Sequence, residues 1–193
     1  MLIDKTFFIG NINIPNTDKQ ATIEKLEWFI NRYEPELLQN VLGYELYQEF
    51  KTGIAGEDPA QKWKDLRDGA EYTGLNGRLA KWRGLLEIVV PASGEGEDAI
   101  AAQKQSIIAN YIYYFFLRST VSQTSGAGEN VAKVENGIAI SPEGKMTVAW
   151  NEMVNWINEL ICYLDAKRDI YPEWLKQDKR DLASKFQWIN PLF

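Results

Sequence analysis

The pattern of hydrophobic and polar positions along the chain is strongest at Ile107–Leu117, where Asn110 is the only polar residue. A helix needs about 20 apolar residues to span a bilayer, and this run is shorter. Polar residues bound it on both sides, with Lys104 before it and Arg118 after it. The segment therefore predicts a helix that is buried on nearly all sides of a globular core.

Apolar residues at helical spacing predict further helices in the N-terminal half. They recur over about residues 18–33, and a capping-box sequence at Thr17–Gln20 marks the start of this helix. Pro35 is incompatible with a regular helix interior but suits a first turn, so we expect a second helix from Pro35 to Gly43. The remaining short helices are expected over residues 44–53 and 59–69 and from Pro172 onward.

The two longest predicted helices cover about residues 99–119 and 145–165. A surface linker at Pro91–Asp98 precedes the first, and a polar segment without helical period, Ser119–Gly144, separates the two. The sequence thus predicts a mainly α fold, a helical bundle around these two core helices with two short β-hairpins. We expect one domain over residues 1–193, with an N-terminal half at 1–95 and a C-terminal half at 96–193.

Two Asn-Gly pairs predict the β-hairpins. Asn76-Gly77 and Asn136-Gly137 each lie between short runs with strand character, and a two-residue type I′ turn needs positive φ at both positions. An isolated two-stranded ribbon is marginal in water, so the second hairpin is expected to lean on the domain or to pair with a neighbour's edge. Its candidate contact residues are Val134, Asn136, Gly137, Ile138 and Ile140.

Charge, cysteine content and aromatic content limit the classes of function that the chain can have. With 21 basic and 27 acidic residues the net charge is −6, and without a basic run, binding to nucleic-acid phosphates is disfavoured. Cys162 is the only cysteine, which excludes a disulfide framework, and its apolar context predicts burial. Aromatic residues make up 12% of the chain; most are expected in the core, and the surplus favours an oligomer.

The absence of histidine removes most catalytic possibilities, because histidine is the usual general base and a common metal ligand. Carboxylate chemistry stays open, with Glu34 and Glu36 around Pro35 as one pair, although acidic residues also suit a first helical turn. The glycine segment Ser125–Asn130 lacks the lysine of a phosphate-binding loop. We therefore expect no catalytic residue, no cofactor and no metal.

The C-terminal segment Phe186–Phe193 is unusually apolar for the end of a chain. Pro191 restrains Asn190 to an extended conformation, which suits an arm laid across a surface. The surface is either its own domain or another subunit or partner, and the sequence leaves both open. The candidate contact residues of this arm are Phe186, Trp188, Ile189, Leu192 and Phe193.

Five segments carry a resemblance to a known family. They are NINIPN at Asn11–Asn16, YEPELLQNVLGYELYQEF at Tyr33–Phe50, SIIANYIYYFF at Ser106–Phe116, KMTVAWNEMV at Lys145–Val154, and INP at Ile189–Pro191. Together they resemble a family of uncharacterised proteins of tailed phages and prophages of the Bacteroidetes, whose genes lie among head and neck genes. More loosely, a helical core with a long loop between its longest helices is similar to head-to-tail connector proteins.

That resemblance implies a virion structural protein of the neck, assembled in the host cytoplasm as a ring of about twelve copies between portal and tail. Its expected partners are further copies of itself, the portal protein and tail or neck proteins, with DNA passing unbound and no membrane contact. An acidic channel wall suits DNA passage, since attractive phosphate contacts would hold the genome in place. Two alternatives stay open: a small carboxylate-based enzyme, and a helical adaptor module that binds a host protein.

Overall fold

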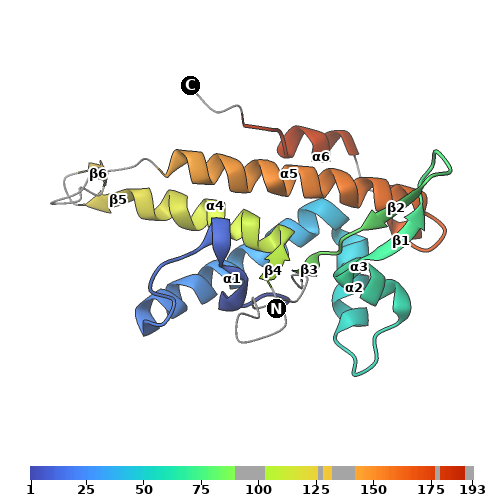
Figure 1. Ribbon diagram of the computed structural model, residues 1–193, viewed down its shortest axis with the longest axis horizontal. Helices are drawn as coiled ribbons and strands as arrows, with labels where there is room; N and C mark the ends of the chain where they lie inside the picture. Colours follow the sequence, from blue (N-terminus) through green and yellow to red (C-terminus); the bar gives the residue numbers. More distant parts are fainter. Residues whose placement is uncertain (90–102, 126–127, 132–141, 177–178, 190–193) are drawn as a thin grey trace, which may run out of the picture.

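A computed structural model describes residues 1–89, 103–125, 128–131, 142–176 and 179–189, and it is mainly helical with small antiparallel strand pairs (Figure 1). The helices are α1 (Gln20–Leu42), α2 (Tyr44–Ile54), α3 (Gln61–Asp68), α4 (Ile107–Val121), α5 (Glu143–Ala166) and α6 (Lys179–Lys185), with the 3-10 helices η1 (Lys5–Phe7), η2 (Gly10–Ile12) and η3 (Pro172–Lys176). The strands are β1 (Ala70–Thr73), β2 (Leu79–Trp82), β3 (Leu86–Val89), β4 (Gln103–Ser106), β5 (Ser122–Ser125) and β6 (Gly128–Val131), paired β1–β2, β3–β4 and β5–β6.

Helix α1 is continuous through Pro35, so the predicted division into two helices is wrong. Pro35 lacks the N–H that would bond to a carbonyl one turn earlier, at a cost of about 3 kcal/mol. Apolar side chains on both sides of it, from Leu26 to Leu42, are buried in the same core, and their packing outweighs that cost. The helix also begins later than predicted, at Gln20, and its N-cap residue Lys19 makes no side-chain capping bond.

The predicted short helices after Gly43 are confirmed as α2 and α3, and the first predicted hairpin is confirmed as β1–β2. Its turn differs from the expectation. The Gly74 N–H donates to the Arg78 carbonyl at 2.8 Å, and Gly77 has a φ of +75° while Asn76 does not have a positive φ. The loop is therefore three residues long with a left-handed glycine at its end, and the Asn76 side chain stabilises it by accepting from the Arg78 N–H at 3.0 Å.

The predicted helix over about 99–119 begins later, at Ile107, as helix α4. Residues 90–102 lie outside the described residues, and Gln103–Ser106 form strand β4 against β3. Ser106 is the last residue of strand β4 and caps helix α4. Its hydroxyl donates to the Leu85 carbonyl at 2.9 Å and accepts from the Ile108 N–H at 3.1 Å. A serine that caps a helix in this way ends the strand at a defined residue.

Helices α4 and α5 run side by side in opposite directions, and α1 packs on the other flank of α4 (Figure 1). Every residue from Ser106 to Tyr113 is buried, which confirms the predicted burial of the apolar segment. The predicted helix over 145–165 is confirmed as α5. Cys162 on α5 is exposed, contrary to the prediction, because the inward positions of that turn are Leu160, Tyr163 and Leu164.

The hairpin β5–β6 extends beyond the ends of α4 and α5 (Figure 1), and the sequence pattern does not predict it. The segment Ser122–Val131 has few residues with strand preference, so the signal for a hairpin is weak there. The predicted hairpin around Asn136-Gly137 lies outside the described residues, as do all of its candidate contact residues, Val134, Asn136, Gly137, Ile138 and Ile140.

Two glycines mark a close crossing of the chain near the end of α3. Gly69 and Gly84 have φ values of +97° and +93° and lie back to back, so that a Cβ at Gly84 would come within 2.6 Å of the Gly69 nitrogen. The crossing is tied to the core by hydrogen bonds: the Leu85 N–H donates to the Leu66 carbonyl at 3.1 Å, and the Trp156 indole N–H donates to the Gly84 carbonyl at 2.7 Å.

Candidate functional site

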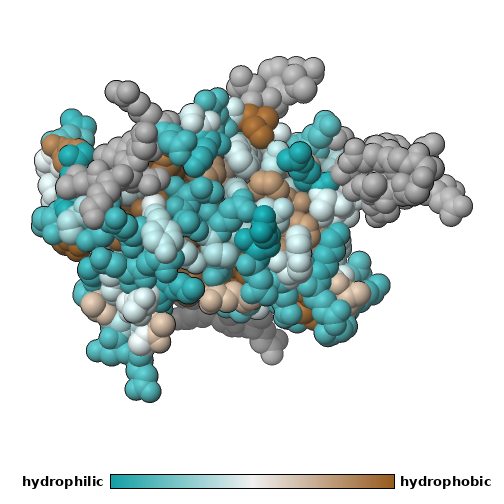
Figure 2. Space-filling view, turned by 180° about the vertical axis from the view of Figure 1, so that it is seen from behind, coloured by the Kyte–Doolittle hydropathy of each residue, from teal (hydrophilic) through white to brown (hydrophobic). Residues whose placement is uncertain are grey.

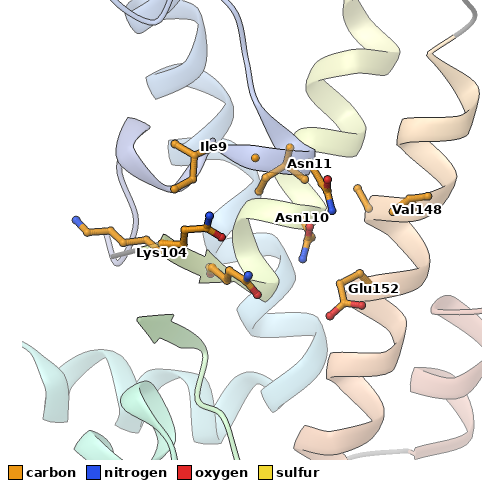
Figure 3. A pocket seen from close by; sticks show the side chains of 12 residues that line it. Ile9, Asn11, Lys104, Asn110, Val148 and Glu152 are labelled. Carbon is orange, nitrogen blue, oxygen red and sulfur yellow. The ribbon is translucent and has the colours of Figure 1, made fainter. Parts of the chain in front are cut away.

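A cavity of about 340 Å³ opens where η2, β4, α4 and α5 meet (Figure 3). All four residues of β4 line it. Successive side chains of a strand point to opposite faces, so contact with four in a row places the cavity along the edge of β4 that is not paired with β3. No backbone hydrogen bond from the other described residues reaches this edge.

Asn110 is the most unusual residue of the cavity wall. Its side chain is 7% exposed, and in Figure 3 its amide points into the space between Asn11 on η2 and Glu152 on α5. It makes no side-chain hydrogen bond to any other residue that the structure describes. The amide lines the open cavity and is within reach of solvent, so it offers a hydrogen-bond donor and an acceptor to a group that enters the cavity.

The charged residues of the cavity wall are already paired. Glu152 accepts a hydrogen bond from Arg83 at 2.9 Å, and Arg83 also binds Glu159 at 2.8 Å and lies over the Trp156 ring. The ammonium of Lys104 donates to the Thr6 hydroxyl at 2.9 Å, and in Figure 3 this side chain extends away from Asn110. The cavity therefore offers mainly neutral hydrogen-bonding groups.

The cavity continues along α5 as a groove. A second depression, of about 390 Å³, shares Gly10, Asn11 and Val148 with the first and extends to Lys145 near the start of α5. Apolar side chains flank it, because Val148 is 59% exposed and Ile9 is 38% exposed. We call this combined surface, from β4 to Lys145, the α5 groove.

The C-terminal arm, residues 186–193, begins on a neighbouring face of α5. Phe186 is buried near Tyr111 and Trp150, with ring centroids 6.4 and 6.2 Å away. The Trp150 indole N–H donates to the Gln187 carbonyl at 2.7 Å. The first part of the arm thus docks on the chain's own domain, one of the two surfaces that the sequence leaves open, while Leu192 and Phe193 lie outside the described residues.

The middle of the arm is held by one side chain. The Asn151 amide donates to the Ile189 carbonyl at 3.0 Å, and the Ile189 N–H donates to the Asn151 side-chain oxygen at 2.9 Å. Ile189 is half-buried, but Trp188 between these anchored residues is 58% exposed. The backbone is therefore fixed while a large aromatic side chain faces solvent. Figure 2, the view from behind Figure 1, shows a face that is largely hydrophilic, with hydrophobic residues in small groups.

The carboxylate pair considered from the sequence has structural roles. Glu34 is buried, and it accepts hydrogen bonds from the Leu2 and Ile3 N–H groups at 2.8 and 3.2 Å. Glu36 accepts from the Tyr111 hydroxyl at 2.9 Å, and burial together with this contact raises the pKa of Tyr111. The two carboxylates bind different parts of the fold, so the structure does not bring them together at a cavity.

Two further observations bear on binding. Among the described residues, no three side chains of the His, Cys, Asp and Glu types come together to hold a metal ion. Within the same ranges, no helix has both the length and the apolar character that a membrane span needs.

Comparison of the chain with protein-family models, with curated protein sequences and with solved structures finds no match.

Proposed function

We propose that the protein is a non-enzymatic structural protein of a tailed-phage virion, which assembles as a head-to-tail connector ring between portal and tail. The observation that carries this proposal is the antiparallel pair α4–α5, a packed scaffold that carries the β5–β6 hairpin at one end. The resemblance of Tyr33–Phe50 and the other quoted segments to a phage neck family supports it.

Surface features agree with assembly. The arm that follows α6 presents Trp188 on an anchored backbone, and the α5 groove combines exposed apolar side chains with the Asn110 amide on its wall. Aromatic and apolar side chains on fixed backbone are typical of residues that contribute strongly to protein interfaces. The net charge of −6 suits a channel wall that DNA passes without binding.

The geometry gives less support to a carboxylate-based enzyme. A glycosidase-type mechanism needs two carboxyl groups that face each other across a substrate. Among the residues that the structure describes, Glu152 is the only acidic one on the wall of the α5 groove, and it is bound to Arg83. An adaptor module that binds a host protein differs from a connector in its mass in solution, which can be measured.

The experiment is light scattering on the purified protein, alone and mixed with the portal protein from the same genome. We expect a ring of many copies, either alone or on the portal, because a connector joins a symmetric portal through repeated contacts. A protein that stays monomeric or dimeric and leaves the portal unbound would contradict the proposal and favour the adaptor module.

We also predict that the protein needs no metal. Thermal unfolding should shift by less than about 1 °C in excess EDTA, because removal of a metal that binds only the folded state lowers the melting temperature. Differential scanning fluorimetry with and without EDTA measures this, and a non-chelating salt at the same ionic strength is the control. A fall of many degrees would show a structural metal and overturn this part of the proposal.

A further inference from the structure

We infer that the α5 groove receives the C-terminal arm, from Trp188 onward, of a second copy of this chain, an inference that rests on the proposed ring. In this arrangement each copy donates an arm and accepts an arm on different surfaces. Contacts of this head-to-tail kind generate a closed ring when the rotation between copies closes. The groove and the arm are the acceptor and the donor of one repeated contact.

The hydrogen-bonding groups of the groove match an extended polypeptide. The unpaired edge of β4 presents backbone N–H and C=O groups at every second residue, a spacing that another extended chain satisfies. The Asn110 amide offers a donor and an acceptor side by side, which fit the C=O and N–H of a peptide unit. From β4 to Val148 the wall offers neutral or already paired groups, which favours backbone over a charged ligand, while the positive charge of Lys145 lies at the other end of the groove.

The arm has the complementary properties. Its backbone is anchored at Gln187 and Ile189, so little further conformational entropy is lost when Trp188 binds. Pro191 favours an extended conformation of the preceding residue, and Leu192 and Phe193 supply apolar side chains. Val148 and Ile9 at the mouth of the groove are exposed apolar residues that such side chains can cover.

The test uses two kinds of variant and a mixture of them. Asn110→Leu and Val148→Lys disable the groove, whereas Trp188→Asp and a deletion of residues 188–193 disable the arm. Leu79→Lys is the matched control, since Leu79 is 74% exposed on β2, away from the groove. Each groove or arm variant should self-associate at least about tenfold more weakly than wild type in sedimentation velocity, and Leu79→Lys should behave as wild type.

The mixture gives the decisive result. A groove variant still has an intact arm and an arm variant an intact groove, so an equimolar mixture should form a 1:1 heterodimer and no larger species. Failure to form this heterodimer when both variants are monomeric would overturn the inference, as would wild-type assembly by either variant. A wild-type protein that never self-associates would also overturn it, while portal binding in the same assay would leave the proposed function standing.

Circular dichroism separates assembly from folding. The Asn110 amide lines the open cavity and bonds to no other side chain that the structure describes, so Asn110→Leu should melt within a few degrees of the wild-type temperature. A melting temperature many degrees lower would show that Asn110 stabilises the fold itself, and it would contradict the role given to this amide.

Discussion

Substitution of Gly84 by alanine is expected to destabilise the protein by about 2–5 kcal/mol, through positive-φ strain and overpacking together. A Cβ at Gly84 would lie 2.6 Å from the Arg67 carbonyl oxygen and from the Gly69 nitrogen, both of which are backbone atoms. Backbone cannot move aside as a flexible side chain can, so α3 and the β2–β3 connection would have to separate. Urea denaturation followed by circular dichroism measures the change in the free energy of unfolding.

Two other glycines separate the causes of this effect. Gly77 has a φ of +75° but open space around a Cβ, so Gly77→Ala should cost only the conformational strain, about 1–2 kcal/mol. Gly144 has neither a positive φ nor a close neighbour, and it lies in α5, so Gly144→Ala should be neutral or stabilising by up to about 1 kcal/mol. Equal losses at Gly84 and Gly77 would show that the close crossing contributes nothing.

Elements with a strong local pattern could be predicted from the sequence. The apolar residues of α4 and α5 recur at helical spacing, and this spacing predicts both the helix and the side of it that is buried. Gly43 and Gly69 end α1 and α3, where the chain needs a positive φ. The Asn76-Gly77 hairpin was found from its turn residues. These helices and this turn depend on residues that are close together in the sequence, so a sequence pattern is enough to predict them.

Features that depend on distant residues were missed. Helix α1 continues through Pro35 because apolar residues before and after the proline are buried in the same core, which the proline alone does not reveal. Strand β4 depends on pairing with β3, and the residues between the two strands include the predicted linker. Asn110 was visible as the one polar residue of an apolar run, but its orientation toward η2 and α5 required the fold.

The C-terminal arm contains one residue whose burial follows from the sequence pattern and, two residues later, one whose exposure required the fold. The sequence treats Phe186 and Trp188 alike, as large apolar residues near the end of the chain. In the fold, Phe186 is 8% exposed between Tyr111 and Trp150, whereas Trp188 is 58% exposed. One side chain completes the core and the other is available for a partner.

We therefore predict opposite effects for alanine at these two positions. Phe186→Ala should lower the free energy of unfolding by about 3 kcal/mol, since it leaves a cavity beside α4 and α5. Trp188→Ala should change it by less than about 0.5 kcal/mol, because an exposed side chain contributes little to folding. In assembly the order reverses: Trp188→Ala should weaken ring or portal binding more than tenfold, as expected of a central interface tryptophan that contributes about 2 kcal/mol or more.

Trp28 on α1 is the matched control for Trp188, since it is 60% exposed and is also a tryptophan. Trp28→Ala should leave both stability and assembly near wild type, because Trp28 is exposed, does not line the α5 groove and is not part of the C-terminal arm. Equal loss of assembly in both tryptophan variants would point to general loss of apolar surface. A Trp188→Ala protein that assembles normally but melts several degrees lower would mean that the arm only closes its own core, and the subunit contact would then lie elsewhere.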